Sequence, residues 1–129
     1  MSDYTFFKID QYEDMAVLTL TESAATRVLQ DGELRIELDA FLLTAKPRCV
    51  MVSFARLKRC PSSLIGGVIG LNKKLKERGS RLKLCDLAPS LRKQFRRLGL
   101  DRVFEIHNSL SDAVAECDQW LVERATSVR

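Results

Sequence analysis

The sequence predicts a single α/β domain over residues 1–129, with a mixed, mainly parallel sheet of four or five strands and about four helices. After two opening strands, segments of helical period alternate with short apolar segments, which is typical of a parallel sheet with right-handed crossovers. The length of 129 residues suits one domain. Since 46% of the residues are hydrophobic and only three are proline, the composition is that of a globular chain rather than a disordered one.

The first half of the chain predicts a strand pair and a helix. Apolar runs at Tyr4–Gln11 and Met15–Leu20 flank the polar turn 12–14, which indicates two antiparallel strands. The segment Thr21–Gln30 is ambiguous between a loop, a helical turn and a short extended piece. From Asp31, apolar residues recur at helical spacing, so we expect a helix capped by Asp31 and stopped by Lys46-Pro47.

The middle of the chain predicts a buried strand followed by the central helix. Cys49–Ala55 is continuously apolar, as in a strand covered on both faces, and should not lie at the sheet edge. A basic loop, 56–59, leads into a helix that starts near Ser63 and ends before Gly79, with Ser62 or Ser63 as its N-cap. Its expected buried stripe is Leu64, Ile65, Val68, Ile69, Leu71 and Leu75. Three glycines, Gly66, Gly67 and Gly70, weaken a helix and therefore predict close packing against the sheet.

The last third predicts two more strands and two more helices. Leu82 and Leu84 alternate with polar residues in a strand, and Pro89 opens a helix with Leu91, Phe95 and Leu98 on its apolar face. After Gly99, a short edge strand is expected at Val103–Ile106. Asn108-Ser109 then caps the final helix, which carries Leu110, Ala113, Val114, Cys117, Trp120 and Leu121.

Charge is distributed unevenly along the chain. The stretch Lys46–Arg102 holds 16 of the 21 basic residues but only 3 of the 17 acidic ones, so it carries +13 and the remainder −9. This predicts a basic face from Lys73, Lys74, Lys76, Arg92, Lys93, Arg96 and Arg97. An acidic protein partner, nucleic acid and plain solvation all fit such a face. Aromatic residues are not interleaved among the bases and no nucleic-acid motif is present, which argues against nucleic acid.

Cysteine and histidine usage argues against an enzyme or a metal protein. Cys49, Cys60, Cys85 and Cys117 have the spacing neither of a zinc site nor of a dense disulfide framework, so buried free thiols are expected, with catalysis or metal binding as the alternatives. His107 is the single histidine and has no evident nucleophile partner. No phosphate-binding glycine loop occurs. We therefore expect a non-enzymatic protein without cofactor or metal.

Targeting signals are also missing from the sequence pattern. No apolar run approaches the length of a membrane span, and the N-terminal residues lack the charged start and apolar stretch of a secretion signal. These observations predict a cytoplasmic protein without membrane insertion.

The stretch CVMVSFARLKRCPSSLIGGVIGLNKKLKERGSRLKLCDLAPSLRKQFRRLGLDRVFEIHNSLSDAVA resembles the second half of a STAS domain, the fold of bacterial anti-sigma factor antagonists. That family has a strand, then D-S-S-G-L-G at a helix start, a glycine turn, a strand, N-L-x-P, a helix, G-L-D-x-x-F, a strand and S-x-x-x-A. The matching positions here are Ser62-Ser63, Gly66, Gly79, Pro89, Gly99-Leu100-Asp101 with Phe104, and Ser109 with Ala113. Pro61 and Ser53 stand where the family has aspartates, and Leu64 replaces a glycine.

The resemblance implies a function as well as a fold. In the family, the first serine is phosphorylated, and its state decides whether the domain binds an anti-sigma factor kinase. Carried over by position, the phosphoacceptor is Ser62, with Ser63 as the alternative. The implied partner-binding surface is Lys58, Arg59, Pro61, Ser62, Ser63, Leu64 and Gly66. A helix N-terminus suits this role, since its unpaired N–H groups and dipole favour a phosphate.

Two functions of different kinds follow from the resemblance. The first is a regulatory protein-binding module of bacterial transcription that binds an anti-sigma factor or a serine-protein kinase under control of serine phosphorylation. The alternative is an accessory or adaptor subunit of a transport or sensory complex, without phosphorylation. The resemblance leaves the oligomeric state open.

Overall fold

A five-stranded sheet in the order β1-β2-β3-β4-β5 forms the centre of the computed structural model, which describes residues 4–26 and 32–127. The strands are β1 (Phe7–Tyr12), β2 (Met15–Leu20), β3 (Cys49–Ser53), β4 (Arg81–Cys85) and β5 (Glu105–His107). β1 pairs with β2 in antiparallel fashion, and each later strand runs parallel to its neighbour. The predicted mixed, mainly parallel α/β sheet is therefore confirmed.

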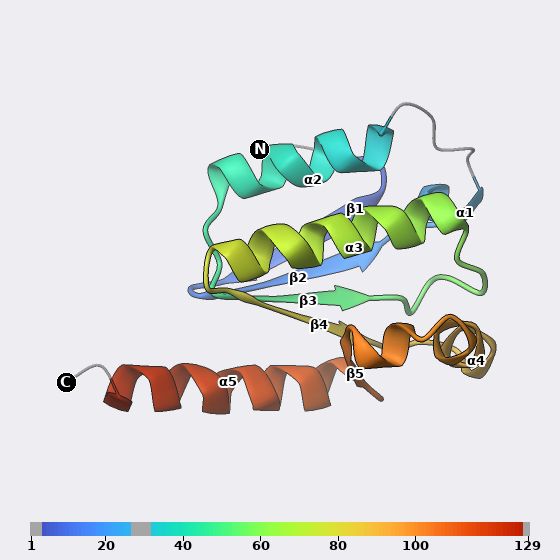
Figure 1. Ribbon diagram of the computed structural model, residues 1–129. Coiled ribbons are helices and arrows are strands. Elements are labelled where there is room, and N and C mark those ends of the chain that lie inside the picture. Colours follow the sequence, from blue (N-terminus) through green and yellow to red (C-terminus); the bar gives the residue numbers. More distant parts are fainter. Residues whose placement is uncertain (1–3, 27–31, 128–129) are drawn as a thin grey trace.

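Helices cover both faces of this sheet. They are α1 (Ser23–Thr26), α2 (Glu33–Thr44), α3 (Ser62–Glu77), α4 (Pro89–Arg97) and α5 (Leu110–Ser127), with a short 3-10 turn, η1 (Leu100–Arg102). Figure 1 shows α2 and α3 side by side on one face, α5 along the opposite face and α4 at the end of the sheet where the parallel strands finish. The central position of β3 agrees with its sequence, because all five of its residues are buried.

Several element boundaries differ from the sequence prediction. The expected Asp31 cap lies outside the described residues, and α2 follows Gly32, whose φ of 72° is left-handed. Residues 23–26 form one helical turn, which settles the first part of the ambiguous segment. The edge strand begins at Glu105 rather than Val103, since residues 100–103 close the η1 turn instead. Ser109 caps α5 as predicted, accepting a hydrogen bond from Asp112 N at 3.2 Å.

Two buried clusters hold the layers together. The larger one lies between the sheet and helices α2 and α3, and it includes Val50, Val52, Leu64, Leu71, Leu75 and Leu84. The residues that alternate with these along the strands point to the other face and pack under α5, where Met51, Cys85 and Ala113 are buried. Two residues expected in the helical stripes are instead at the surface: Ile69 is 41% and Leu98 56% exposed.

Cys49 of β3 and Cys117 of α5 form a disulfide, with their Cα atoms 6.4 Å apart. The prediction of free thiols is therefore wrong for this pair and correct for Cys60 and Cys85, which are free and buried. Sequence spacing did not indicate the bond, because its two sulfurs meet only through the packing of α5 on β3.

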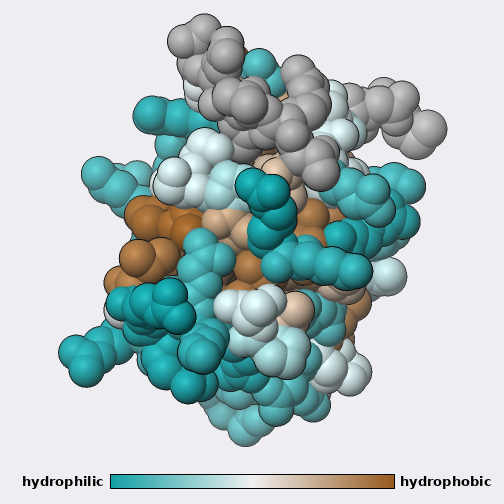
Figure 2. All heavy atoms as spheres, turned by 90° about the vertical axis from the view of Figure 1, so that its right-hand side faces the viewer, coloured by the Kyte–Doolittle hydropathy of each residue, from teal (hydrophilic) through white to brown (hydrophobic). Residues whose placement is uncertain are grey.

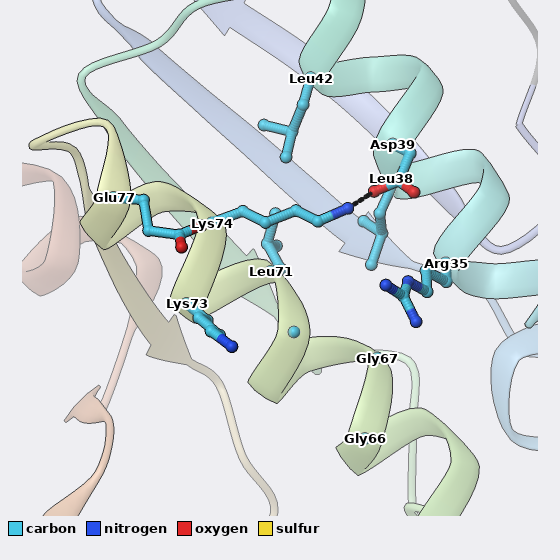
Figure 3. Close-up of a pocket in the computed structure, with 11 residues that line it drawn as sticks. Arg35, Leu38, Asp39, Leu42, Gly66, Gly67, Leu71, Lys73, Lys74 and Glu77 are labelled. Atoms are coloured by element: carbon cyan, nitrogen blue, oxygen red, sulfur yellow. Dashed lines mark hydrogen bonds and ion pairs between the residues drawn. The ribbon is translucent and has the colours of Figure 1, made fainter.

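The three glycines of α3 have different surroundings. A Cβ at Gly67 would lie 2.5 Å from Leu34 Cδ2, so this glycine allows α2 to approach α3; the expected close approach is to a helix and not to the sheet. A Cβ at Gly66 or Gly70 would meet nothing within 4 Å. All three line a groove of about 280 Å³ between the helices, which the ion pair between Lys74 and Asp39 crosses (Figure 3).

Candidate functional site

The two serines singled out in the sequence lie at the start of α3. Pro61 occupies the N-cap position with an extended backbone (φ −63°, ψ 156°), and Ser62 is the first helical residue. The carbonyl of Pro61 accepts hydrogen bonds from Leu64 N at 3.0 Å and Ile65 N at 3.1 Å. No side chain caps this helix, so the prediction that Ser62 or Ser63 is the N-cap is wrong. The fixed φ of proline suits this entry to the helix, and both serine side chains are left exposed.

The loop that precedes the serines is anchored by apolar side chains and presents cations. Phe54, Leu57 and Cys60 are at most 4% exposed, and Phe54 N donates to Cys85 O at 3.0 Å. Between these anchors, Arg56, Lys58 and Arg59 are exposed. The alternation of buried and exposed positions therefore places the cations on the surface immediately before Ser62.

Helix α4 packs against this loop and adds charge to the same end of the molecule. Gln94 Nε2 donates to Cys60 O at 3.0 Å, and the ring of Phe95 meets that of Phe54 edge to face at 5.8 Å. The cations on its outer side, Lys93, Arg96 and Arg97, are exposed. Figure 2 views the molecule from this end and shows a band of apolar residues bordered by polar ones. We name the exposed residues Arg56, Lys58, Arg59, Ser62, Ser63, Lys93, Arg96 and Arg97 the α3-entry surface.

The basic face expected from the sequence is divided among several places. Lys74 forms its ion pair with Asp39 across the α2–α3 groove, and Arg92 donates to Asn108 Oδ1. Lys73 lines the same groove, whereas Lys76 lies beside a separate hollow near Trp120. Only the α4 members of the set lie beside the loop that precedes Ser62.

A carboxylate that sequence reasoning missed lies beneath this surface. Ser53, which is 3% exposed, donates through Oγ to Asp86 Oδ2 at 2.7 Å, and Ala55 N donates to Ser53 Oγ at 3.3 Å. Asp86 Oδ1 accepts from Leu110 N at 3.2 Å. Asp86 therefore ties the end of β4 to the end of β3 and the start of α5. It supplies a carboxylate next to Ser53, which has none, and its place directly after the strand RLKLC was the available signal.

The two free thiols near the site, Cys60 and Cys85, are not activated as nucleophiles. Burial raises the pKa of Cys60 to about 12. Burial, followed by the charge of Asp86, raises the pKa of Cys85 to about 12 as well. Since the thiolate is the nucleophile and the metal ligand, neither cysteine is activated at neutral pH. Within residues 4–26 and 32–127, no group of three or more His, Cys, Asp or Glu side chains is placed to hold a metal ion.

The predicted partner-binding residues do not all reach the surface. Lys58, Arg59, Ser62, Ser63 and Gly66 are exposed and Pro61 is half-buried. Leu64 is 0% exposed, because its side chain belongs to the core between α3 and the sheet. The site is therefore an exposed hydroxyl at a helix N-terminus with cations around it. This arrangement favours an added anion at Ser62 through the unpaired N–H groups and the helix dipole.

No helix among the described residues is long and apolar enough to span a membrane. The cytoplasmic location stays a prediction.

Comparisons with known proteins agree with this fold. A family model described as "Mlab, STAS domain" matches residues 9–111. A variant of RsbS from Moorella thermoacetica superposes with a TM-score of 0.71 at 13% identity, covering 91% of this chain and 98% of its own. The anti-sigma factor antagonist SpoIIAA in its unphosphorylated form gives 0.68 at 18% identity, with 88% and 96% covered. The phosphorylated form of SpoIIAA from Bacillus gives 0.61 at 19%, with 86% and 98% covered. No curated protein matches the sequence significantly.

Proposed function

This chain belongs to the STAS domain family, and we propose that it is a non-enzymatic regulatory module of the anti-sigma factor antagonist type. Its partner in this proposal is an anti-sigma factor or a related serine-protein kinase, bound at the α3-entry surface. Two of the similar structures are of SpoIIAA, which is named as an anti-sigma factor antagonist and was solved with and without phosphorylation.

The observation that carries the proposal is the exposure of Ser62 at the first turn of α3, with a hydroxyl that caps nothing. A residue retained only for helix capping would accept a backbone N–H, as Ser109 does at α5. Ser62 does not have that role and lies on the surface, three residues after the exposed Arg59. It is therefore available to a kinase, with Ser63 as the alternative acceptor.

Phosphorylation of Ser62 would change binding more than folding. A phosphoserine adds about −1.5 to −2 charges and strong acceptor oxygens, which the N–H groups of the first helical turn and the neighbouring cations can accommodate. A partner that must cover this surface would instead have to desolvate the new charge. The same phosphate therefore leaves the domain intact and releases the partner.

The test compares Ser62→Asp with Ser62→Ala after the partner has been isolated from the native cell and identified by mass spectrometry. Since Ser62 caps no N–H, Ser62→Ala should unfold within about 0.5 kcal/mol of wild type and bind normally. Ser62→Asp should be equally stable or gain about 0.3 to 1 kcal/mol from the helix dipole, yet bind the partner more weakly by about 2 to 5 kcal/mol. Affinity by titration calorimetry and melting temperature measure the two effects separately.

The salt dependence of binding provides the control. Replacing Arg96 and Arg97 with Gln should slow association and flatten its dependence on salt, because exposed cations steer an acidic partner at long range. Replacing the distant, exposed Lys8 with Gln removes a charge from edge strand β1 and should leave the association rate near that of wild type. If Ser62→Asp binds as wild type does, the phosphorylation switch is wrong.

A second function is favoured by one feature, the proline at position 61 in place of the aspartate that precedes the serine in this family. A kinase that recognises the aspartate would not recognise this loop. In that case the domain is an adaptor subunit of a transport or sensory complex that uses the same surface constitutively. Co-purification with a membrane ATPase, with no phosphate on Ser62 or Ser63, would support the adaptor.

A further inference from the structure

A polar hollow lies at the β5 edge of the sheet, where the first residues of β4 have no partner in β5. β5 pairs only with residues 83–85 of β4, so no strand of the described chain covers the edge of β4 at Arg81 and Leu82. The hollow has a volume of about 400 Å³. Its polar and aromatic lining comes from α3 (Asn72, Lys76), the start of β4 (Arg81), β5 (Glu105) and α5 (Trp120, Arg124).

Asn72 is the unusual member of this lining. Its side chain is only 7% exposed, and within residues 4–26 and 32–127 its amide has no hydrogen-bond partner. No fully enclosed polar side-chain atom lacks a partner in this part of the chain, so the Asn72 amide must keep access to the hollow. Since the amide is not enclosed, its hydrogen-bonding groups stay open to a molecule in the hollow. A ligand that entered the hollow could supply the missing hydrogen bonds.

The charges around Asn72 select the kind of ligand. Lys76 and Arg81 line the hollow, and its single lining carboxylate is that of Glu105. Glu105 already accepts a hydrogen bond from the buried Lys83 at 2.6 Å, and it lies 3.9 Å from Arg81 Nη1. The excess positive charge beside an unpaired amide therefore favours an anion.

Trp120 orients the arginine of β4 that lines the hollow. The Cζ atom of Arg81 lies 5.0 Å from the centroid of its ring, and that of Arg124 lies at the same distance. A guanidinium that packs on an aromatic ring can still donate hydrogen bonds from the N–H groups at its edge. The donor set is then an amide N–H₂ and an ammonium from α3 with the Arg81 guanidinium from β4. Donors that converge from different elements suit an anion with several acceptor oxygens, as a phosphate monoester has.

We propose that this hollow binds the phosphate group of a small phosphate monoester, through Asn72, Lys76 and Arg81. The site is separate from the α3-entry surface, because Ser62 and Asn72 are ten residues apart along α3, about 15 Å at the helical rise. The inference goes beyond the proposed function and does not depend on it.

Trp120 provides the readout, since it is the one tryptophan of the chain. The purified protein is titrated with inorganic phosphate and with glycerol phosphate at constant ionic strength, and with sodium chloride as the reference. We expect a saturable change of Trp120 fluorescence with both phosphates and none with chloride. Bound phosphate should also raise the melting temperature, because a ligand that binds only the folded state stabilises it.

Two variants and a matched control test the residues. Arg81→Gln and Asn72→Leu should each weaken phosphate binding about tenfold or more, the equivalent of ~1.4 kcal/mol. Asn72→Leu should at the same time leave the melting temperature near that of wild type, because the accessible amide bonds no other group of the described chain. Lys8→Gln removes one charge from the opposite edge of the sheet and should keep affinity within about twofold of wild type.

Three results would overturn the proposal. The first is a fluorescence response that does not saturate with either phosphate. The second is an equal loss of affinity in Lys8→Gln and Arg81→Gln, which would mean that phosphate senses only the overall charge. The third is a lower melting temperature for Asn72→Leu, which would mean that the amide is bonded within the fold.

Discussion

At the scale of single residues, Lys83 is notable because it is a charged side chain buried in the fold. It lies in β4 under α5 and is 1% exposed, and its Nζ donates to Glu105 Oε2 at 2.6 Å and lies 3.4 Å from His107 Nε2. An ammonium without a partner in such a place would carry a large desolvation cost. Glu105, whose side chain is 49% exposed, therefore neutralises Lys83 from the strand edge. The His107 imidazole also belongs to this cluster.

The ion pair between Lys83 and Glu105 predicts that the stability of the protein depends on pH. Burial raises the pKa of Glu105, but the hydrogen bond and charge of Lys83, with Arg81 and His107, outweigh this and hold the pKa below its usual value. A depressed carboxyl pKa contributes stability that is present above the unfolded value of about 4.3 and is lost as pH falls through the lower, folded value. Glu105→Gln should therefore destabilise the protein near neutral pH by about 1 to 3 kcal/mol, less than for a fully buried pair because Glu105 is half exposed.

Urea unfolding of wild type and Glu105→Gln at neutral pH and at about pH 3 measures this effect, since the difference should shrink in acid. The double variant Lys83→Met with Glu105→Gln is the control. It removes both charges and should recover most of the lost stability, because an apolar side chain at position 83 has no desolvation cost. A stability difference that is the same at both pH values would contradict the assignment.

At the scale of elements, α3 connects the two proposed sites and depends on one glycine for its packing on α2. Gly67 lies against the side chain of Leu34, whereas a Cβ at Gly70, which also lines the α2–α3 groove, would meet nothing within 4 Å. Both glycines weaken the isolated helix to the same degree. Only their surroundings distinguish them.

Alanine substitutions at Gly67 and Gly70 distinguish the surroundings of the two glycines. Gly67→Ala should destabilise the protein by about 1 to 3 kcal/mol, because the new methyl group would overlap the buried side chain of Leu34, which would have to leave its packed position. Gly70→Ala should stabilise it by about 0.5 to 1 kcal/mol, since the methyl group meets nothing and the helix gains propensity. Chemical denaturation of both variants measures these two changes in the free energy of unfolding. Equal effects would show that α2 does not approach α3 as closely as described.

At the scale of the whole molecule, α5 is held on its own face of the sheet by a small cluster and one covalent bond. The disulfide links Cys49 of β3 to Cys117 of α5 across 68 residues of sequence. The buried residues around it, Val17, Met51, Cys85 and Ala113, form a much smaller core than that under α2 and α3. The bond therefore adds a covalent link to a small apolar interface.

Removing the disulfide should lower stability while leaving the fold of the larger core in place. For a closed loop of this length, the loss of chain entropy in the unfolded state predicts about 4 kcal/mol. Wild-type protein should melt at a lower temperature in the presence of a reductant, and Cys117→Ala should melt low with or without it. Cys60→Ala, which removes a free thiol, should keep the sensitivity of wild type to the reductant. A reductant-insensitive wild type would contradict the bond.

The sequence by itself determined the order of the elements, the buried central strand, the helix that starts at the serines and the concentration of charge. These features depend on local periodicity, on turn residues and on composition, all of which can be read along one segment. The resemblance of the second half to STAS domains followed from the same segments, and the family model agrees with it.

Only the tertiary structure decided the contacts between distant segments. Asp86 reaches Ser53 from 33 residues away, Cys117 meets Cys49 from 68, and the Asn72 amide opens into a hollow built from α3, β4, β5 and α5. Gly67 differs from Gly70 only because Leu34 lies against it. Each of these depends on strand register and on how a helix is rotated over the sheet. No local pattern encodes such relations, since they arise when the layers pack.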